Sequence, residues 1–500
     1  EKFTCMTERE ILLPESSLIH ARLKCSREIE LVAPAPVHPT EKGSLECDDD
    51  SGNEEAQQRP KLQACASRIW LCCRVVGVYL ASVLASGMLA VWPVVQPYFE
   101  AEGVFADLCD SRADAEGKAS GGACPQQDAM LSQAYLLGAN MLLVGLWPQG
   151  IIFDAWGARR TTIVGCMCCC AGNAGLAFAA GHPAHYSWVL FPGVVLTEVG
   201  STMNSFGLYG FLWHFHNRQG FLSGLANSTY SVSCMVPLAL LQFFKFKLAL
   251  WVSTFNAVLA LLLCVIFVPT SAEYFAKAEE ILGGKFEAPG FALMPVLRSC
   301  RKVFQANCQD NALFTISLLF MICSYQYYTA IAYPFLVALL KSDSAATQVT
   351  LAGSEVYSVL GFFLSPVAGC LTDWLGMKML IISMTVLSTI MAPLMFMPRV
   401  DLQIGGNVVG TLLSLLQGTY YIRWFALYAP PHMFGNFQGA VVSGCGVLSL
   451  AIQSLLQASF GSGSLGKGLV ALAAPLGILQ SLNVTSGLVF CCRIMNSGVA

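Results

Sequence analysis

The side chains best suited to polar chemistry lie together in a short segment between two long apolar runs. This segment, GIIFDAWGARRTT at residues 150–162, holds one carboxylate, two tight-turn glycines and two guanidinium groups, at Gly150, Asp154, Gly157, Arg159 and Arg160. A carboxylate accepts hydrogen bonds and guanidinium groups donate them, so the segment can tie chain ends together. Its position between apolar runs is typical of a cytoplasmic hairpin that joins two membrane helices.

The same motif returns later in the chain. In GCLTDWLGMKM, each of four residues lies 219 positions after its counterpart in the first copy: Gly369, Asp373, Gly376 and Lys378. The same offset carries Asn217, Gln219 and Gly220 onto Asn436, Gln438 and Gly439. Seven positions in one register are hard to obtain by chance. They indicate two homologous halves arranged in parallel.

The composition is that of a membrane protein. Of the 500 residues, 55% are hydrophobic and 12% are charged, whereas about 25% charged residues is usual for a soluble domain. The net charge of -3 and the lack of a basic run with interleaved aromatic residues argue against a nucleic-acid partner. Many of the 21 cysteines, such as Cys166 and Cys169, lie inside apolar runs, where we interpret them as small hydrophobic residues.

The expected fold class is an all-α membrane protein with twelve transmembrane helices, six in each half. An open sheet edge cannot be satisfied in lipid, and about 20 apolar residues span the hydrocarbon core. Runs with few or no charges that meet this length lie at 75–97, 129–153, 161–181, 187–213, 219–244, 248–269, 311–340, 348–372, 379–398, 405–430, 434–460 and 469–492. The expected domains are a disordered cytosolic tail at 1–68, a first bundle at 69–269, a linker at 270–310 and a second bundle at 311–500.

Basic loop residues indicate the orientation. One side of the predicted bundle carries Arg159, Arg160, Arg218, Lys285, Arg298, Arg301, Lys302, Lys378 and Arg493, while the opposite loop at 98–128 is mainly acidic. The basic side is expected to be cytoplasmic, although isolated basic residues such as Lys245, Lys341 and Arg399 fall on the other side. Both termini and the linker are then cytosolic, and AEYFAKAEEIL in the linker predicts a short surface helix.

The 98–128 loop contains Cys109 and Cys124. On an oxidising face, two cysteines in one loop favour a disulfide. The alternative is two free thiols.

The pattern G-x-x-x-D-x-x-G-x-[RK]-[RK], its weaker repeat and the twelve predicted spans resemble the major facilitator superfamily, over about residues 70–493. Within it, EGVFADLC, LWPQGIIFD and FGLYGFLWHFHNRQGFLSGLANSTYS are similar to segments of the system-L-type facilitative amino-acid transporters and their apicomplexan relatives. The resemblance implies two six-helix bundles with pseudo-symmetry and the transport of a small solute.

The chain departs from the superfamily motif at the residue after each aspartate, which is usually arginine and here is Ala155 or Trp374. Arg159 or Arg160 could take its place. In the superfamily arrangement, the carboxylate of Asp154 is well placed to accept hydrogen bonds from the N-terminus of the eleventh helix, whose free N–H groups carry positive dipole charge. Such a contact would bias one gate. The alternative is that Asp154 and the arginines only fix the hairpin.

The resemblance also implies that the first, fourth, seventh and tenth helices line a central cavity. The candidate substrate-binding residues on the last three are Glu198, Ser201, Tyr325, Gln326, Gln417, Thr419 and Arg423. An ionisable group within a spanning helix costs about 2.5 to 3.5 kcal/mol, so it needs a partner. The 219-residue offset places Arg423 near mid-depth. Its partner is either Glu198 or the carboxylate of a substrate.

The leading hypothesis is alternating-access transport of an amino acid or similar zwitterion at the plasma membrane, by facilitated diffusion. Helix 75–97 contains no Asp, Glu or His, so only Glu198 could relay protons. The alternatives are a carrier for sugars, nucleosides or monocarboxylates, and a non-transporting sensor on the same fold. No HExxH or GxSxG motif suggests an enzyme. No cofactor or metal site is expected, the partners are the solute and the bilayer, and a monomer is compatible with the sequence.

Overall fold

The computed structural model describes the backbone of residues 53–85, 87–109, 125–233, 235–286, 293–461 and 469–496. The chain divides into two compact units, Glu1–Cys65 and Ala66–Ala500, and the elements that matter below belong to the second. Most of the expected tail at 1–68 lies outside the described residues. Helix α2 already begins at Asn53, so the boundary expected near residue 68 does not coincide with the start of a helix.

The described residues of the first half form helices joined by short turns, and the first helix, α2, begins within the first unit. The elements of this half are α2 (Asn53–Leu84), η1 (Leu89–Val91), α3 (Trp92–Ala101), η2 (Ala106–Leu108), α4 (Pro125–Val144), α5 (Leu146–Gly181), α6 (Pro183–Tyr186), η4 (Ser187–Val189), α7 (Leu190–Tyr209), η5 (His216–Arg218), α8 (Gln219–Ser233), α9 (Met235–Phe243) and α10 (Phe246–Phe267).

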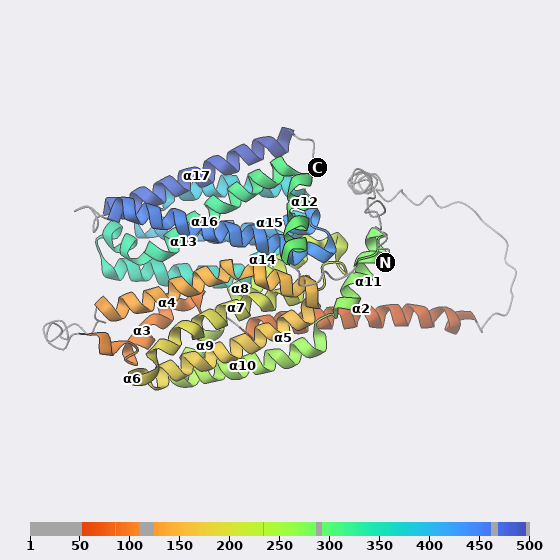
Figure 1. Ribbon diagram of the computed structural model, residues 1–500, viewed down its shortest axis with the longest axis horizontal. Helices are drawn as coiled ribbons and strands as arrows, with labels where there is room; N and C mark the ends of the chain where they lie inside the picture. Colours follow the sequence, from red (N-terminus) through yellow and green to blue (C-terminus); the bar gives the residue numbers. More distant parts are fainter. Residues whose placement is uncertain are drawn as a thin grey trace, which may run out of the picture. The chain divides into compact units, whose positions relative to one another are not determined.

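Two linker helices, α11 (Ser271–Leu282) and α12 (Leu293–Ala306), precede the second half. That half consists of α13 (Cys308–Leu340), α14 (Asp343–Leu394), α15 (Val400–Tyr428), η6 (Pro431–Met433), α16 (Phe434–Gly461) and α17 (Leu469–Asn496). In Figure 1 the long helices of both halves run side by side in one direction, whereas α12 crosses them near one end. The all-α membrane fold expected from the sequence is confirmed.

Eight helices within the described residues are long and apolar enough to cross a membrane. Two of these, α5 and α14, each consist of two helices that meet at a kink at a single glycine. Helix α14 covers the expected span 348–372 and most of 379–398, whereas α5 covers all of 161–181 but only the end of 129–153, most of which lies in α4. Gly157 has φ 80° and Gly376 has φ 77°. Only glycine adopts this conformation readily, so both motif glycines are required by the hairpins. The total of twelve spans stays a prediction.

The expected first span at 75–97 is not continuous. Helix α2 ends at Leu84, and α3 begins at Trp92 with Pro93 in its first turn. The open turn between them leaves backbone N–H groups without helical partners, and the side chain of Glu198 accepts hydrogen bonds from Met88 and Leu89. The buried carboxylate of Glu198 thus takes the place of the backbone carbonyl groups that would accept these hydrogen bonds in a continuous helix.

The surface helix expected in the linker is present as α11. It begins with a capping box formed by Thr270 and Glu273, and it ends at Gly283 in the left-handed conformation. Glu273 also forms an ion pair with Arg74 at 2.8 Å. Burial alone would raise the pKa of the Glu273 carboxyl, but hydrogen bonds from Arg74 and the Thr270 N–H hold it below its ordinary value. The linker is therefore tied to α2 through Arg74. The second linker helix, α12, is an addition to the expectation.

Candidate functional site

A cavity of about 490 Å³ lies between the two halves. Its walls come mainly from α4, α7 and α8 of the first half and from α13, α14 and α15 of the second. Four of the candidate residues line it, namely Ser201, Tyr325, Gln326 and Gln417. Among the described residues that line the cavity, none is Asp, Glu, Lys, Arg or His. The site is therefore polar but uncharged.

Three candidate residues do not line the cavity. Thr419 is fully buried and donates to the backbone oxygen of Leu415 on its own helix. It follows Gln417 by two residues, about 200° around the helix axis, so the two side chains cannot share a face. Glu198 is also fully buried, and its carboxylate accepts a hydrogen bond from Leu89 in the open turn before η1.

Arg423 lies away from mid-depth, which corrects the expectation. Its guanidinium donates to Gln219 Oε1 at 2.6 Å, and Nη2 lies 3.8 Å from Asp373 Oδ1. The ion pairs between described residues do not include one between Arg423 and Glu198. Arg423 precedes Tyr428, the last residue of α15, by five positions, which is about 7.5 Å along the axis. It therefore belongs to the hairpin end of the bundle.

Asp154 joins the two halves at this end. Its two carboxylate oxygens accept from Gly435 N at 2.9 Å and Asn436 N at 2.7 Å, at the start of α16, and one also accepts from the Asn436 side chain at 2.7 Å. The side chain is 2% exposed. The contact expected with the N-terminus of the eleventh predicted span is confirmed. Neither Arg159 nor Arg160 replaces the missing arginine: Arg159 donates to Val268 O at 2.8 Å, at the end of α10, and Arg160 is exposed.

Asp373 makes the corresponding contact in the second copy. It accepts from Gly220 N at 2.7 Å and Phe221 N at 2.8 Å, at the start of α8. Each aspartate therefore reaches into the opposite half and satisfies free N–H groups at a helix N-terminus. We call the Asp154 and Asp373 contacts the two clasps, and the end of the bundle that carries them the motif end. Lys378 is half-buried, and none of the ion pairs between described residues includes it.

Glycines allow the helices to meet closely at both clasps. A Cβ atom on Gly150 would collide with the backbone oxygen of Gly435, and one on Gly369 would collide with that of Gly220. Since Gly150 and Gly369 are counterparts, so are Gly435 and Gly220, which lie 215 residues apart. The 219-residue offset therefore holds for the hairpins but is wrong for α8 and α16.

The error has a simple origin. Both helices begin with a G-x-x-x-G pattern, Gly220 and Gly224 in α8 and Gly435 and Gly439 in α16. A slip of four residues is about one helical turn, so it superimposes one glycine of each pair on the wrong partner. These small-residue patterns, which bring membrane helices close together, were the overlooked signal for the contact between the halves.

An aromatic cluster strengthens the closure at the motif end. The ring of Phe153 lies 6.1 Å from that of Phe434 and 5.9 Å from that of Tyr274, between centroids. The Tyr274 hydroxyl, on linker helix α11, donates to Pro431 O at 3.3 Å. The linker therefore takes part in the barrier between the cavity and the motif end.

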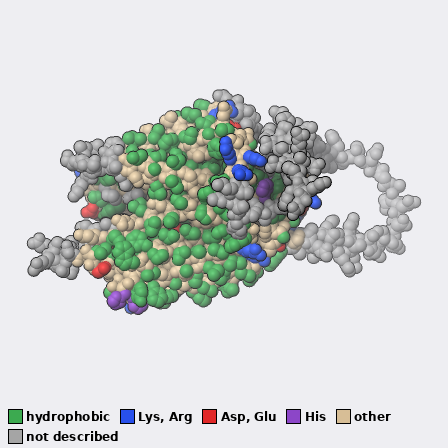
Figure 2. All heavy atoms as spheres, viewed as in Figure 1, with side chains coloured by type: hydrophobic (Ala, Val, Ile, Leu, Met, Phe, Trp, Pro, Cys, Tyr) green, Lys and Arg blue, Asp and Glu red, His purple; other side chains and the backbone are tan. Residues whose placement is uncertain are grey.

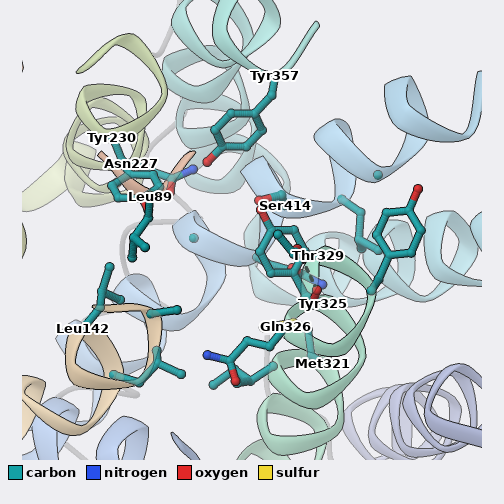
Figure 3. Close-up of a pocket in the computed structure, with 18 of the residues that line it drawn as sticks. Leu89, Leu142, Asn227, Tyr230, Met321, Tyr325, Gln326, Thr329, Tyr357 and Ser414 are labelled. Carbon is teal, nitrogen blue, oxygen red and sulfur yellow. Dashed lines mark hydrogen bonds between the residues drawn. The ribbon is translucent and has the colours of Figure 1, made fainter. Parts of the chain in front are cut away.

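Gln326 is held in a defined orientation at the cavity wall. Its side-chain oxygen accepts from Ser449 Oγ at 3.1 Å and from Gln453 Nε2 at 3.3 Å, both on α16. Gln453 also donates to Ser449 Oγ at 3.0 Å. Because this network uses the carbonyl oxygen of Gln326, its NH₂ group is left to donate into the cavity. Figure 3 shows Gln326 beside Tyr325 on α13.

The cavity has a polar and an apolar side. In Figure 3, Tyr357, Ser414 and Tyr325 lie on one side, while Leu89 and Leu142 lie on the other, with Asn227 next to Leu89. Asn227 reaches from α8 into the second half and donates to Ser365 Oγ at 3.2 Å. Asn227 and Tyr357 were not among the candidates, because they lie on the fifth and eighth predicted spans, and only the first, fourth, seventh and tenth were expected to line the cavity. Cys109 is not among the residues that line the cavity. Cys124 falls outside the described residues, so their bridge stays a prediction.

No model of a known protein family matches the chain. The "Large neutral amino acids transporter small subunit 3" of Homo sapiens is 26% identical over 179 residues, covering 35% of this chain and 31% of that protein. The protein of the same name from Mus musculus is 27% identical over 158 residues, covering 29% of this chain and 28% of the relative. The matched segments thus span under a third of these relatives.

Solved structures resemble the chain over most of its length. The proton:xylose symporter XylE bound to 6-bromo-6-deoxy-D-glucose has a TM-score of 0.60 at 12% identity, over 84% of this chain and 95% of that one. A double-tryptophan mutant of XylE has a TM-score of 0.59 at 12% identity, over 84% and 94% of the two chains. The chain has the major facilitator fold.

Proposed function

We propose that this chain, which has the major facilitator fold, carries a small solute across a membrane by alternating access. One observation carries the proposal: a cavity lies between two halves that are joined at one end by a pair of equivalent clasps. Contacts made by a few side chains and helix ends can be broken and remade as the halves rock. The Asp154 and Asp373 contacts would close the motif end while the cavity is reached from the other side.

The solute is uncharged overall. A free carboxylate or ammonium ion leaving water needs an opposite charge or a full set of hydrogen bonds. The described lining residues include no ionisable side chain of either sign apart from tyrosine and offer mainly hydroxyl, amide and apolar groups. This lining argues against a monocarboxylate as the solute. A neutral zwitterion, a sugar and a nucleoside remain.

Among these, an amino acid with an apolar side chain fits best. The leucines on one side of the cavity would contact an apolar side chain, while the donors and acceptors on the other would bind the polar backbone groups (Figure 3). The free NH₂ group of Gln326 is suited to a carboxylate oxygen, and the tyrosine rings to an ammonium group. A sugar presents hydroxyl groups all around and would leave the apolar side unused. The partial similarity to transporters named for large neutral amino acids agrees with this choice.

Facilitated diffusion is the mechanism we propose, at the plasma membrane. Glu198 was the one acid expected to be able to relay protons, but it binds the open turn before η1 and does not line the cavity. Its carboxylate has a structural task that does not depend on the solute.

Purified protein in liposomes provides the test. Uptake of labelled leucine, phenylalanine, glucose, uridine and lactate would be compared with and without an inward proton gradient. We expect saturable uptake of the two amino acids, unchanged by the gradient. Uptake of glucose or uridine alone would show that the solute is not an amino acid. Uptake that depends on the gradient would show proton coupling in place of facilitated diffusion. No uptake of any solute would favour a sensor.

A further inference from the structure

Linker helix α12 has two faces of opposite character. Val296 and Cys300 are buried, at 4% and 8% exposed, and Val303 and Phe304 pack against the same core. The opposite face carries Arg298, Arg301 and Lys302, all exposed. The spacing of three and four residues places the three cations on one stripe.

The helix is fixed where the chain enters the second half. Asn311, near the start of α13, is 2% exposed and donates to the backbone oxygens of Val303 at 3.3 Å and Phe304 at 3.2 Å. Trp424 Nε1 in turn donates to Asn311 Oδ1 at 3.2 Å. These bonds satisfy carbonyl groups at the end of α12 and tie it to the bundle. In Figure 1, α12 crosses the long helices near their ends, as a helix lying in the plane of a membrane surface would.

The cations of α12 are not used within the described part of the protein. None of the ion pairs between described residues involves Arg298, Arg301 or Lys302. The acid closest to them along the described chain after the helix, Asp310, is paired with Arg493 at 3.3 Å. Figure 2 shows Lys and Arg side chains gathered over α12 on the flank of the bundle, beside a largely hydrophobic surface.

We propose that this basic face of α12 binds the anionic headgroups of lipids in the cytoplasmic leaflet. An amphipathic helix in the interface plane, with basic residues on one face, is suited to anionic lipid, and each cation near such a surface adds to the attraction. Here the apolar face is already used by the bundle, so the lipid contact is electrostatic. The site is independent of the cavity and of the proposed solute.

The test measures binding of dansyl-labelled phosphatidylserine to the purified full-length chain in phosphatidylcholine mixed micelles, by energy transfer from its tryptophans. The test variant is Arg298→Gln/Arg301→Gln/Lys302→Gln. The control, Lys245→Gln/Lys341→Gln/Arg399→Gln, makes the same change in charge at exposed residues. These three flank helices α10, α13 and α15 at the ends away from the clasps.

The loss of about fivefold in affinity per cation predicts up to a hundredfold weaker binding by the test variant at low salt. The control should bind as the original chain does, and 0.5 M salt should weaken binding by the original chain. Arg298→Lys/Arg301→Lys retains the charge and should retain binding, which separates charge from misfolding. The lipid site would be overturned if the test variant bound phosphatidylserine as tightly as the original chain, or if the control lost as much affinity as the test variant. Full competition by millimolar inorganic phosphate would also overturn it.

Discussion

At the scale of single residues, the two aspartates of the repeated motif have a role that follows from helix electrostatics. Each accepts hydrogen bonds from N–H groups that begin a helix of the opposite half, where the helix dipole favours negative charge. Asp154 has two such donors and a third in the side chain of Asn436, and it is almost fully buried. Asp373 has two, with Arg423 further away at 3.8 Å. The first clasp is therefore expected to be the stronger.

Asp154→Asn should reduce the rate of transport about tenfold and leave surface expression largely intact. The substitution removes the charge from three hydrogen bonds, and such bonds are each worth about 1.5 to 3 kcal/mol. Asp373→Asn should have a smaller effect. Initial rates of uptake, normalised to the protein at the cell surface, measure both. Unchanged turnover in Asp154→Asn would show that the aspartate only fixes the geometry of the hairpin.

The orientation of Gln326 depends on Ser449 and Gln453, which were not among the candidate residues. Ser449→Ala should remove one of the two hydrogen bonds to the side-chain oxygen of Gln326. The KM of uptake should rise about two- to tenfold, because one neutral hydrogen bond contributes about 0.5 to 1.5 kcal/mol. Turnover at saturating solute should stay the same. Gln326→Leu should raise the KM at least as much. If KM is unchanged in both variants, Gln326 does not bind the solute.

The sequence predicted the clasp better than the cavity, for reasons that residue positions make clear. Asp154, Gly157 and their repeat lie at a fixed distance from a helix end, so the hairpins fix their depth. Arg423 lies on a long apolar helix, where depth depends on the helix ends. The ends of α7 and α15, Tyr209 and Tyr428, do keep the 219-residue offset, but Arg423 lies only five residues before the end of its helix. Glu198 was recognised as costly to bury, but its partner is a backbone break that composition does not reveal.

At the scale of elements, the contact between the halves depends on four glycines. The pairs formed by α5 with α16 and by α14 with α8 bring backbone against backbone at Gly150 and Gly435 and at Gly369 and Gly220. Close approach of this kind lets neighbouring helices pack without intervening side chains. It is also what allows each carboxylate to reach a helix N-terminus.

Gly150→Ala should prevent the motif end from closing, because the new Cβ would collide with a backbone oxygen that has no room to move. We expect uptake to fall at least tenfold. Gly444→Ala is the matched control on α16, since a Cβ there would meet nothing within 4 Å. Labelled uptake and protein yield should be measured together. Equal activity in the two variants would show that close glycine contact is not needed for transport.

The loop between α3 and α4 offers a test of the expected sidedness. Cys109 and Cys124 should form a disulfide, because this loop is expected to face an oxidising compartment. Peptide mapping of purified protein, alkylated without reduction, should recover the two cysteines in one linked peptide. If both cysteines are alkylated without prior reduction, they are free thiols and the predicted disulfide is wrong.

At the scale of the whole molecule, two helical halves enclose a cavity whose described lining residues carry no charge, and two equivalent clasps join the halves at one end. The general arrangement could be predicted, because apolar runs and a repeated motif report directly on spans and duplication. The interrupted first span could not, since residues 75–97 contain no charged residue and the break is stabilised by a residue more than a hundred positions away. The substrate class follows only from the character of the cavity walls.

Counterflow in liposomes tests the central claim most directly, because only a carrier that returns through its solute-bound states can exchange one molecule for another. Liposomes with the purified protein would be preloaded with unlabelled leucine and diluted into a trace of labelled leucine. We expect labelled leucine to rise transiently above its equilibrium level, and no such rise after preloading with glucose. A missing overshoot with every neutral amino acid tested, or an overshoot driven by glucose, would contradict an alternating-access carrier of neutral amino acids.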